Sequence, residues 1–130
     1  MPGDLADIRR WTIQEVSAHL ARGDSLYFLD VRRHPDCTQI KGASYWPPFD
    51  LLKADQIVLP FPKEALIIPY CDEPHEQLSA QIARKLLGLG YVHVYPLLGG
   101  YTTWRRRRIG YPIERRPVGR SRETFSESLN

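Results

Sequence analysis

The residue best placed to carry chemistry is Cys71, in the segment Y-C-D-E-P-H-E-Q-L-S over residues 70–79. An apolar run from Leu66 to Tyr70 precedes it, and a helical pattern of apolar residues begins at about Glu76. The thiol is therefore expected between a strand end and the first turn of a helix. Unpaired backbone N–H groups and the helix dipole stabilise a thiolate there. A buried, inert cysteine at a strand end is the alternative.

The loop that follows this thiol is acidic. It comprises Asp72, Glu73, Pro74, His75, Glu76 and Gln77. Each of its three carboxylates opposes ionisation of the thiol and repels an anionic sulfur donor. Asp72 or Glu76 would also favour the start of the helix, and this capping role is the simpler interpretation. His75 is expected to be a solvated loop residue, with protonation of a leaving group as the alternative.

The second cysteine, Cys37, is expected to be a buried free thiol rather than a resolving partner for Cys71. Two cysteines do not make a disulfide framework, and no histidine pair with ligand spacing accompanies them. Structural zinc sites need four such ligands. We therefore expect neither a metal nor a cofactor.

Short apolar runs and helical patterns alternate along the chain. Strands are expected over residues 26–30, 43–46, 66–70 and 91–95, and helices over residues 12–23, 49–54, 76–88 and 101–108. This alternation is typical of a parallel sheet with helices on both faces, whose ligands lie beyond the carboxyl ends of the strands. Both Asp30 and Cys71 follow strands and belong to this edge. Pro69 is unusual for a central strand.

The length and composition indicate an ordinary globular domain. The chain has 130 residues, of which 42% are hydrophobic and 25% charged, and this fits one domain with its own core. No apolar run approaches the roughly 20 residues that a membrane-spanning helix needs. The first residues include acids and lack the apolar segment of a secretory signal. A cytoplasmic location is therefore expected.

The positive charge is concentrated at one end of the chain. The first 100 residues contain 10 Lys or Arg and 12 Asp or Glu, whereas the last 30 contain 8 Arg and 3 Glu. This distribution argues against a nucleic-acid-binding fold. Consecutive side chains on a helix point in different directions, so Arg105–Arg108 are expected to form a solvated helix end rather than a binding patch.

Six short segments resemble, in order and spacing, motifs of the rhodanese-like family, the sulfurtransferase superfamily. The resemblance extends over roughly residues 10–114. The segments are D-V-R at 30–32, Q-I-K-G-A at 39–43, Y-C at 70–71, L-G-Y at 89–91, L-G-G-Y-T-T-W at 98–104 and G-Y-P at 110–112. The resemblance implies one domain over residues 1–114, with about five mostly parallel strands and helices on both faces. Residues 115–130 are expected to form a disordered basic tail, because they lack apolar periodicity.

The resemblance also implies a function for the thiol. In active members, a cysteine at the position of Cys71 accepts sulfane sulfur as a persulfide and passes it to a nucleophile. Residues 72–77 would then cradle the outer sulfur, and Asp30 and Arg32 would support the strand end and its neighbouring loop. The expected partners are a sulfane-sulfur donor, which is a small molecule or a protein, and a thiol or another nucleophilic acceptor.

The chain departs from the usual family pattern around this thiol. Family loops often carry arginines that attract thiosulfate, but no basic residue follows Cys71 before Arg84. The spacing from Cys71 to Gly90 is longer than usual, and Gln39 replaces a histidine of the family motif. The loop resembles a family variant with a second cysteine, which is Glu73 here.

These observations favour a single-domain sulfurtransferase or persulfide carrier. The alternative is a rhodanese-like binding or sensor module without turnover, which the acidic, arginine-free loop supports. A phosphatase of related fold is the least favoured, because phosphate chemistry needs an arginine fork and no arginine lies in the loop.

Overall fold

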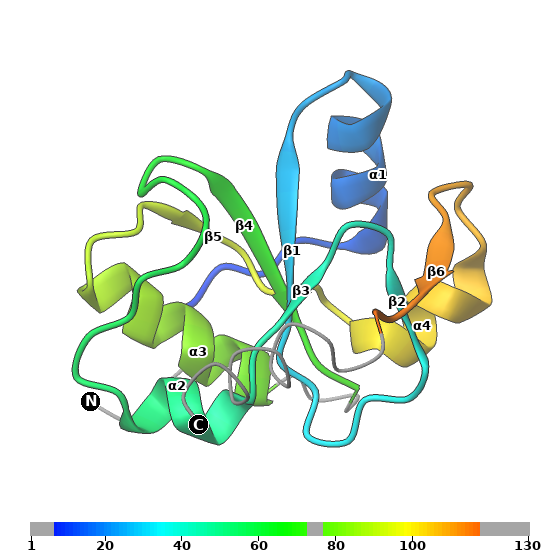
Figure 1. Cartoon of the computed structure of the whole chain (residues 1–130). Helices are drawn as coiled ribbons and strands as arrows, with labels where there is room; N and C mark the ends of the chain where they lie inside the picture. Colours follow the sequence, from blue (N-terminus) through cyan, green and yellow to red (C-terminus); the bar gives the residue numbers. More distant parts are fainter. Residues whose placement is uncertain (1–6, 73–76, 118–130) are drawn as a thin grey trace.

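The computed structural model describes residues 7–72 and 77–117 of the chain. A four-stranded parallel sheet lies at its centre, in the order β3-β1-β4-β5 (Figure 1). Its strands are β1 (Leu26–Asp30), β3 (Ser44–Tyr45), β4 (Leu66–Tyr70) and β5 (His93–Val94). β1 pairs with β4 along the full length of both strands, so these two strands form the middle of the sheet.

Helices cover both faces of the sheet. They are α1 (Ile13–Ala21), α2 (Pro48–Lys53), α3 (Gln77–Gly88) and α4 (Gly100–Arg107). α2 and α3 lie on one face, where Leu51 and Leu86 are buried, and α1 and α4 lie on the other, where Val16 and Trp104 are buried (Figure 1). The expected α/β class is therefore confirmed. No helix within residues 7–72 and 77–117 is long and apolar enough to cross a membrane.

The apolar run of β4 reflects burial on both faces of the sheet. Ile67 packs into the cluster under α2 and α3, whereas Ile68 and Tyr70 pack into the cluster under α1 and α4. All three side chains are fully buried. A strand with both faces buried requires apolar residues at successive positions, which is why this run shows no polar alternation.

Pro69 is accommodated in β4 although this strand is central. Its carbonyl oxygen accepts a hydrogen bond from the Leu97 N–H at 3.0 Å, on the side of β4 away from β1. A residue's N and C=O face the same neighbouring strand, so the missing N–H of Pro69 also faces this side. β5 ends at Val94, which pairs with Ile67. The proline therefore lies beyond the β4–β5 pairing and breaks none of its hydrogen bonds.

The start of α1 shows how local sequence fixes an element. The Thr12 hydroxyl accepts a hydrogen bond from the Glu15 N–H at 3.0 Å, and Glu15 Oε1 accepts one from the Thr12 N–H at 2.8 Å. This reciprocal pair is the capping box that the sequence T-I-Q-E predicts, and it satisfies backbone donors at the helix start.

A separate antiparallel ribbon replaces the expected fifth strand of the sheet. β2 (Thr38–Ile40) pairs with β6 (Ile113–Arg115), and Gln39 Nε2 donates to Glu114 Oε2 at 2.5 Å. The parallel sheet itself is extended only by a single bridge between Trp11 and Leu97 among the described residues. The two ribbon strands are three residues long and come from distant parts of the chain, so no local apolar pattern indicates them.

The ribbon carries the chain past the expected domain boundary at residue 114. Arg115 belongs to β6, and the Arg116 N–H donates to the Cys37 carbonyl oxygen at 2.8 Å. Disorder was expected over residues 115–130, and residues 118–130 of this range lie outside the described residues, so their disorder stays a prediction.

Candidate functional site

Cys71 lies at the carboxyl edge of the parallel sheet, directly after β4. Its side chain is 0% exposed. The Sγ atom donates to the Ser79 Oγ atom, 3.6 Å away in the first turn of α3. The Cys71 carbonyl oxygen accepts a hydrogen bond of 2.8 Å from the N–H of Tyr101 in the first turn of α4. The thiol is thus held where β4, α3 and α4 meet.

Two residues of the expected loop belong to the described part of the chain. Asp72 is half-buried, and its backbone carbonyl oxygen accepts a hydrogen bond from the Thr102 hydroxyl at 3.4 Å. Gln77 is exposed and begins α3. The remaining expected loop residues lie outside the described residues, so their placement around the thiol stays a prediction: Glu73, Pro74, His75 and Glu76.

Asp30 and Arg32 form a buried ion pair at the end of β1. Arg32 Nη2 donates to Asp30 Oδ2 at 2.7 Å, and Arg32 Nε donates to both carboxylate oxygens at 3.0 and 3.1 Å. The two side chains are 0% and 2% exposed, respectively. The Tyr70 hydroxyl donates to Asp30 Oδ2 and accepts from the Ile40 N–H, both at 3.2 Å. The pair thereby connects β1 with β4 and β2.

The Arg32 guanidinium is a fixed positive charge under the site. It stacks on the Tyr101 ring at 4.1 Å from the centroid and donates to the Thr38 carbonyl oxygen at 2.6 Å. Burial acts to lower the pKa of Arg32, but hydrogen bonding and charge from Asp30 outweigh it and raise that pKa. Burial, and then the negative charge of Asp30, raise the pKa of Tyr70, which stays a neutral donor.

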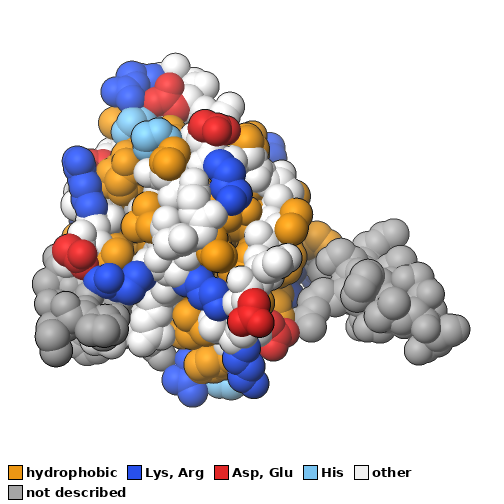
Figure 2. Space-filling model, turned by 90° about the vertical axis from the view of Figure 1, so that its left-hand side faces the viewer, with side chains coloured by type: hydrophobic (Ala, Val, Ile, Leu, Met, Phe, Trp, Pro, Cys, Tyr) orange, Lys and Arg blue, Asp and Glu red, His pale blue; other side chains and the backbone are white. Residues whose placement is uncertain are grey.

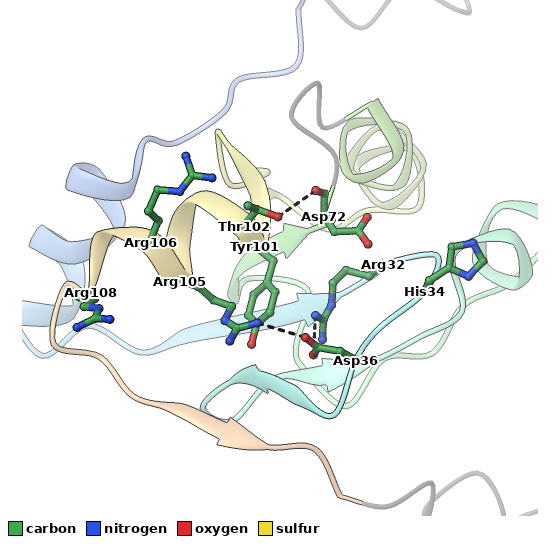
Figure 3. A pocket seen from close by; sticks show the side chains of 9 residues that line it. All are labelled: Arg32, His34, Asp36, Asp72, Tyr101, Thr102, Arg105, Arg106 and Arg108. Atoms are coloured by element: carbon green, nitrogen blue, oxygen red, sulfur yellow. Dashed lines mark hydrogen bonds and ion pairs between the residues drawn. The ribbon is translucent and has the colours of Figure 1, made fainter.

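A pocket of about 520 Å³ lies next to the Cys71–Asp72 backbone, between α4 and the β1–β2 loop (Figure 3). It is lined by Arg32, His34, Asp36, Asp72, Tyr101, Thr102, Arg105, Arg106 and Arg108. Four arginines face two aspartates in this lining, so the pocket is positively charged overall. The buried Cys71 thiol is not part of the lining.

Arg105, Arg106 and Arg108 line this pocket, and all four side chains of residues 105–108 are exposed, as expected for a solvated helix end. Arg105 and Arg106 follow Tyr101 and Thr102 by four residues, and residues with this spacing share a helix face. Arg108 ends α4 with left-handed backbone (φ 51°), so its side chain leaves the helical direction. Lys and Arg are dispersed among other side chains on the face that Figure 2 shows. Arg105, Arg106 and Arg107 follow one another in the last turn of α4.

Asp36 holds two of the pocket arginines. Its Oδ1 lies 3.3 Å from Arg32 Nη1, and its Oδ2 lies 3.3 Å from Arg105 Nη1 (Figure 3). It also accepts hydrogen bonds from the Thr38 N–H at 2.9 Å and the Thr38 hydroxyl at 2.8 Å. Partial burial acts to raise the pKa of Asp36, but the Thr38 hydrogen bonds and Arg32 lower it below its ordinary value. Asp36 is therefore ionised at neutral pH.

The expected burial of Cys37 is wrong, because this side chain is exposed. Asp36 accepts the hydrogen bonds of Thr38 across a tight turn, and the intervening residue faces solvent. Neither Cys37 nor Cys71 is in a disulfide. Within the described ranges, no group of three or more His, Cys, Asp or Glu side chains is arranged to hold a metal ion.

Sequence reasoning missed the contribution of α4 to this site. It did not select Tyr101, Thr102 or Asp36 as site residues, whereas the Tyr101 ring is buried yet also lines the pocket, as do Thr102 and Asp36. One signal was available: α4 follows β5, and segments that follow neighbouring parallel strands meet at the same edge of a sheet.

Comparisons with known proteins identify the family. The family model for the rhodanese-like domain matches residues 12–107. The Alr3790 protein from Anabaena matches with a TM-score of 0.69 and 26% identity, covering 88% of this chain and 99% of that one. A thiosulfate sulfurtransferase from Pseudomonas aeruginosa matches with a TM-score of 0.63 and 29% identity, covering 83% of this chain and 20% of that one. No curated protein sequence matches this chain. Because the family model spans well over half of its length, the chain belongs to the rhodanese-like domain family.

Proposed function

We propose that this domain is a single-domain sulfurtransferase or persulfide carrier, with Cys71 as the nucleophile that holds the transferred sulfur. The position of Cys71 carries this proposal: it follows a central parallel strand and adjoins a positively charged pocket. Ligands of such sheets bind beyond the carboxyl ends of the strands. The similarity to a thiosulfate sulfurtransferase from Pseudomonas aeruginosa supports the same chemistry.

The proposed reaction has two displacement steps and no net redox change. The Cys71 thiolate, having lost its proton to solvent, attacks the outer sulfur of a sulfane-sulfur donor. The donor's S–S bond breaks, and its electron pair leaves with the donor remnant, which would be sulfite for thiosulfate. An acceptor thiolate then attacks the outer sulfur on Cys71. The Sγ–S bond breaks, its electron pair restores the Cys71 thiolate, and the acceptor leaves as a persulfide.

Several residues are assigned supporting roles in this proposal. Asp30 and Arg32 fix the end of β1, and Asp72 to Gln77 form the cradle of the outer sulfur. The chemistry needs no metal or cofactor, because the thiolate is itself the nucleophile. We assign it to the cytoplasm, whose reducing conditions keep thiols out of disulfides.

A binding or sensor module without turnover is the second candidate, and the burial of the thiol favours it. The Cys71 side chain is 0% exposed, and Asp72 lies beside it in the chain. A donor therefore reaches the thiol only after local opening, and the neighbouring acid repels anionic donors.

Mass spectrometry of the intact protein, after incubation with several sulfane-sulfur donors, tests the proposal. We expect a labile gain of about 32 Da per sulfur atom, as for a persulfide. The gain should disappear in Cys71→Ala and remain in Cys37→Ala, and a thiol acceptor should remove it. If every donor leaves Cys71 unmodified, or if Cys71→Ala loads equally, the sulfur-carrier proposal fails. Failure to load any donor would leave the binding or sensor module as the better interpretation.

A further inference from the structure

We propose that the arginine-lined pocket binds the negative charges of a small thiol that carries two or more carboxylates, and thereby selects the sulfur acceptor. The inference rests on the proposed function of Cys71 and adds the chemical class of its partner. A volume of about 520 Å³ lies within the range of small-molecule pockets.

The pocket arginines have donors available for such a ligand. Arg32 is committed to its buried pair with Asp30, and Arg105 is half-exposed and reaches Asp36 at 3.3 Å. Arg106 and Arg108 make no hydrogen bond or ion pair with any other described residue. A guanidinium presents five N–H donors in a planar fork that matches the two oxygens of a carboxylate. Two carboxylates can therefore be held without disrupting the buried pair.

The fold connects these arginines to the thiol. The Tyr101 N–H binds the Cys71 carbonyl oxygen at 2.8 Å, and the Thr102 hydroxyl reaches the Asp72 carbonyl oxygen at 3.4 Å. Arg105 and Arg106 lie one helical turn further along α4. Figure 3 shows Thr102 and Asp72 in contact beside these arginines, so a ligand held by this turn of α4 lies next to residues 71 and 72.

Asp72 is expected to orient the bound ligand within the pocket. It lines the same pocket, and its carboxylate repels negative charge at the end nearest the thiol. The carboxylates of a ligand are therefore driven toward α4, while its sulfur is left near Cys71. A small dianion such as thiosulfate cannot separate its charge from its reacting sulfur in this way. We expect the pocket to favour a larger carboxylated thiol.

Equilibrium binding of an unreactive probe tests the pocket without any sulfur chemistry. Succinate is titrated into Cys71→Ser protein by isothermal calorimetry, with uncharged succinamide as the matched control ligand. The triple variant Arg105→Gln/Arg106→Gln/Arg108→Gln should weaken succinate binding about tenfold or more, because charge-assisted hydrogen bonds are lost. Arg107→Gln is the matched control variant, since Arg107 does not line the pocket, and it should bind succinate as the parent does.

Two outcomes of the titration would overturn the proposal that the pocket binds carboxylates. One is no measurable succinate binding to the parent, and the other is equal weakening by Arg107→Gln and the triple variant. The variant Arg105→Lys/Arg106→Lys/Arg108→Lys keeps the charge and should recover part of the affinity. Thermal unfolding of each variant checks that its fold is intact.

Sulfur transfer from loaded Cys71 tests the selection of the acceptor. The rates for mercaptosuccinate and for neutral 2-mercaptoethanol are compared at equal thiolate concentration. Their ratio should fall about tenfold in the triple glutamine variant and stay unchanged in Arg107→Gln. It should also shrink toward about 1 M salt, where charges are screened within roughly 3 Å. A ratio that is equal in parent and triple variant refutes the inference.

The two experiments separate failure of the pocket from failure of the proposed function. If Cys71 never loads sulfur but succinate binding depends on the three arginines, the sulfur-carrier function fails and the anion pocket stands. If Cys71 loads sulfur but neither succinate binding nor the acceptor ratio depends on the arginines, the function stands and the pocket inference fails.

Discussion

Replacing Arg32 by methionine tests how strongly the buried ion pair supports the candidate site. The substitution keeps a long side chain but leaves the Asp30 carboxylate, which is 0% exposed, without its counter-charge. Removing one partner of a buried pair costs about 3–5 kcal/mol. About 1 kcal/mol shifts the melting temperature of a domain of this size by about 4 °C, so we expect Arg32→Met to melt about 12–20 °C lower.

Asp30→Leu should be more destabilising than Arg32→Met. The Asp30 carboxylate also accepts hydrogen bonds from the Arg32 N–H at 3.1 Å and the Tyr70 hydroxyl at 3.2 Å. Its loss leaves a buried guanidinium without a counter-charge and leaves these two donors without an acceptor. Each buried unsatisfied group lowers the free energy of unfolding by about 1–3 kcal/mol. The double variant lacks both charges. Its loss in free energy of unfolding should therefore be at least about 2 kcal/mol smaller than the sum of the losses in the two single variants.

Urea unfolding followed by circular dichroism measures these differences in the free energy of unfolding. Arg107→Met is the control, because Arg107 is exposed and does not line the pocket, and its change should stay within about 0.5 kcal/mol. Arg32→Lys keeps the charge and serves if Arg32→Met does not fold. The reasoning is refuted if Arg32→Met lies within about 1 kcal/mol of the parent, or if the single effects simply add in the double variant.

Three further predictions concern other parts of the molecule. Because the pKa of Asp36 is depressed, its stabilisation is present above the ordinary value of 3.8 and is lost as the pH falls through the native value. The melting temperature should therefore fall further between pH 7 and pH 3 for the parent than for Asp36→Asn. An equal fall in both proteins would contradict this. Iodoacetamide should modify exposed Cys37 at least about tenfold faster than buried Cys71, and peptide mass spectrometry measures both rates. Comparable rates would show that the reagent reaches the Cys71 thiol readily. Removing residues 118–130, which lack apolar periodicity, should change the melting temperature by less than about 2 °C. Removing residues 113–130 also deletes β6 and should lower the melting temperature clearly. A large drop for the shorter deletion would show that the tail contributes to the fold.

The elements around Cys71 were predictable because their signals are local. The run from Leu66 to Tyr70 needs no alternation, since both faces of β4 are buried. The capping box at Thr12 fixed one helix start from four residues. The order of parallel strands then placed Cys71 and Asp30 at one edge of the sheet, as the switch from strand to helix implies.

The composition of the pocket was not predictable from such local signals. The direction of Arg108 depends on its left-handed backbone, and that of Arg105 depends on a partner, Asp36, that is distant in sequence. The absence of arginine from the loop after Cys71 suggested a site without positive charge. The fold instead supplies the charge from the end of α4 and from Arg32 after β1, which lie far from this loop in the sequence. Exposure of Cys37 likewise follows from the turn that Asp36 makes with Thr38.

The opposing charges of Asp72 and the α4 arginines lead to a last prediction, in which the two effects have opposite signs. In a Cys37→Ala background, Cys71 is alkylated with negatively charged iodoacetate and neutral iodoacetamide. Both reagents require the thiolate and the same access to the buried thiol, so the ratio of their rates isolates the field that the charged reagent meets.

Asp72→Asn should raise the ratio of iodoacetate to iodoacetamide rates, and the triple glutamine variant of Arg105, Arg106 and Arg108 should lower it. Exposed charge pairs contribute about 0.2–1 kcal/mol, so each change should be about 1.5- to fivefold at low salt. Both changes should fade as salt screens the charges over about 8–10 Å. A ratio that stays constant in Asp72→Asn at low salt means that this carboxylate does not face the path of the reagent. The helix-capping role expected for Asp72 from the sequence would then replace the electrostatic one.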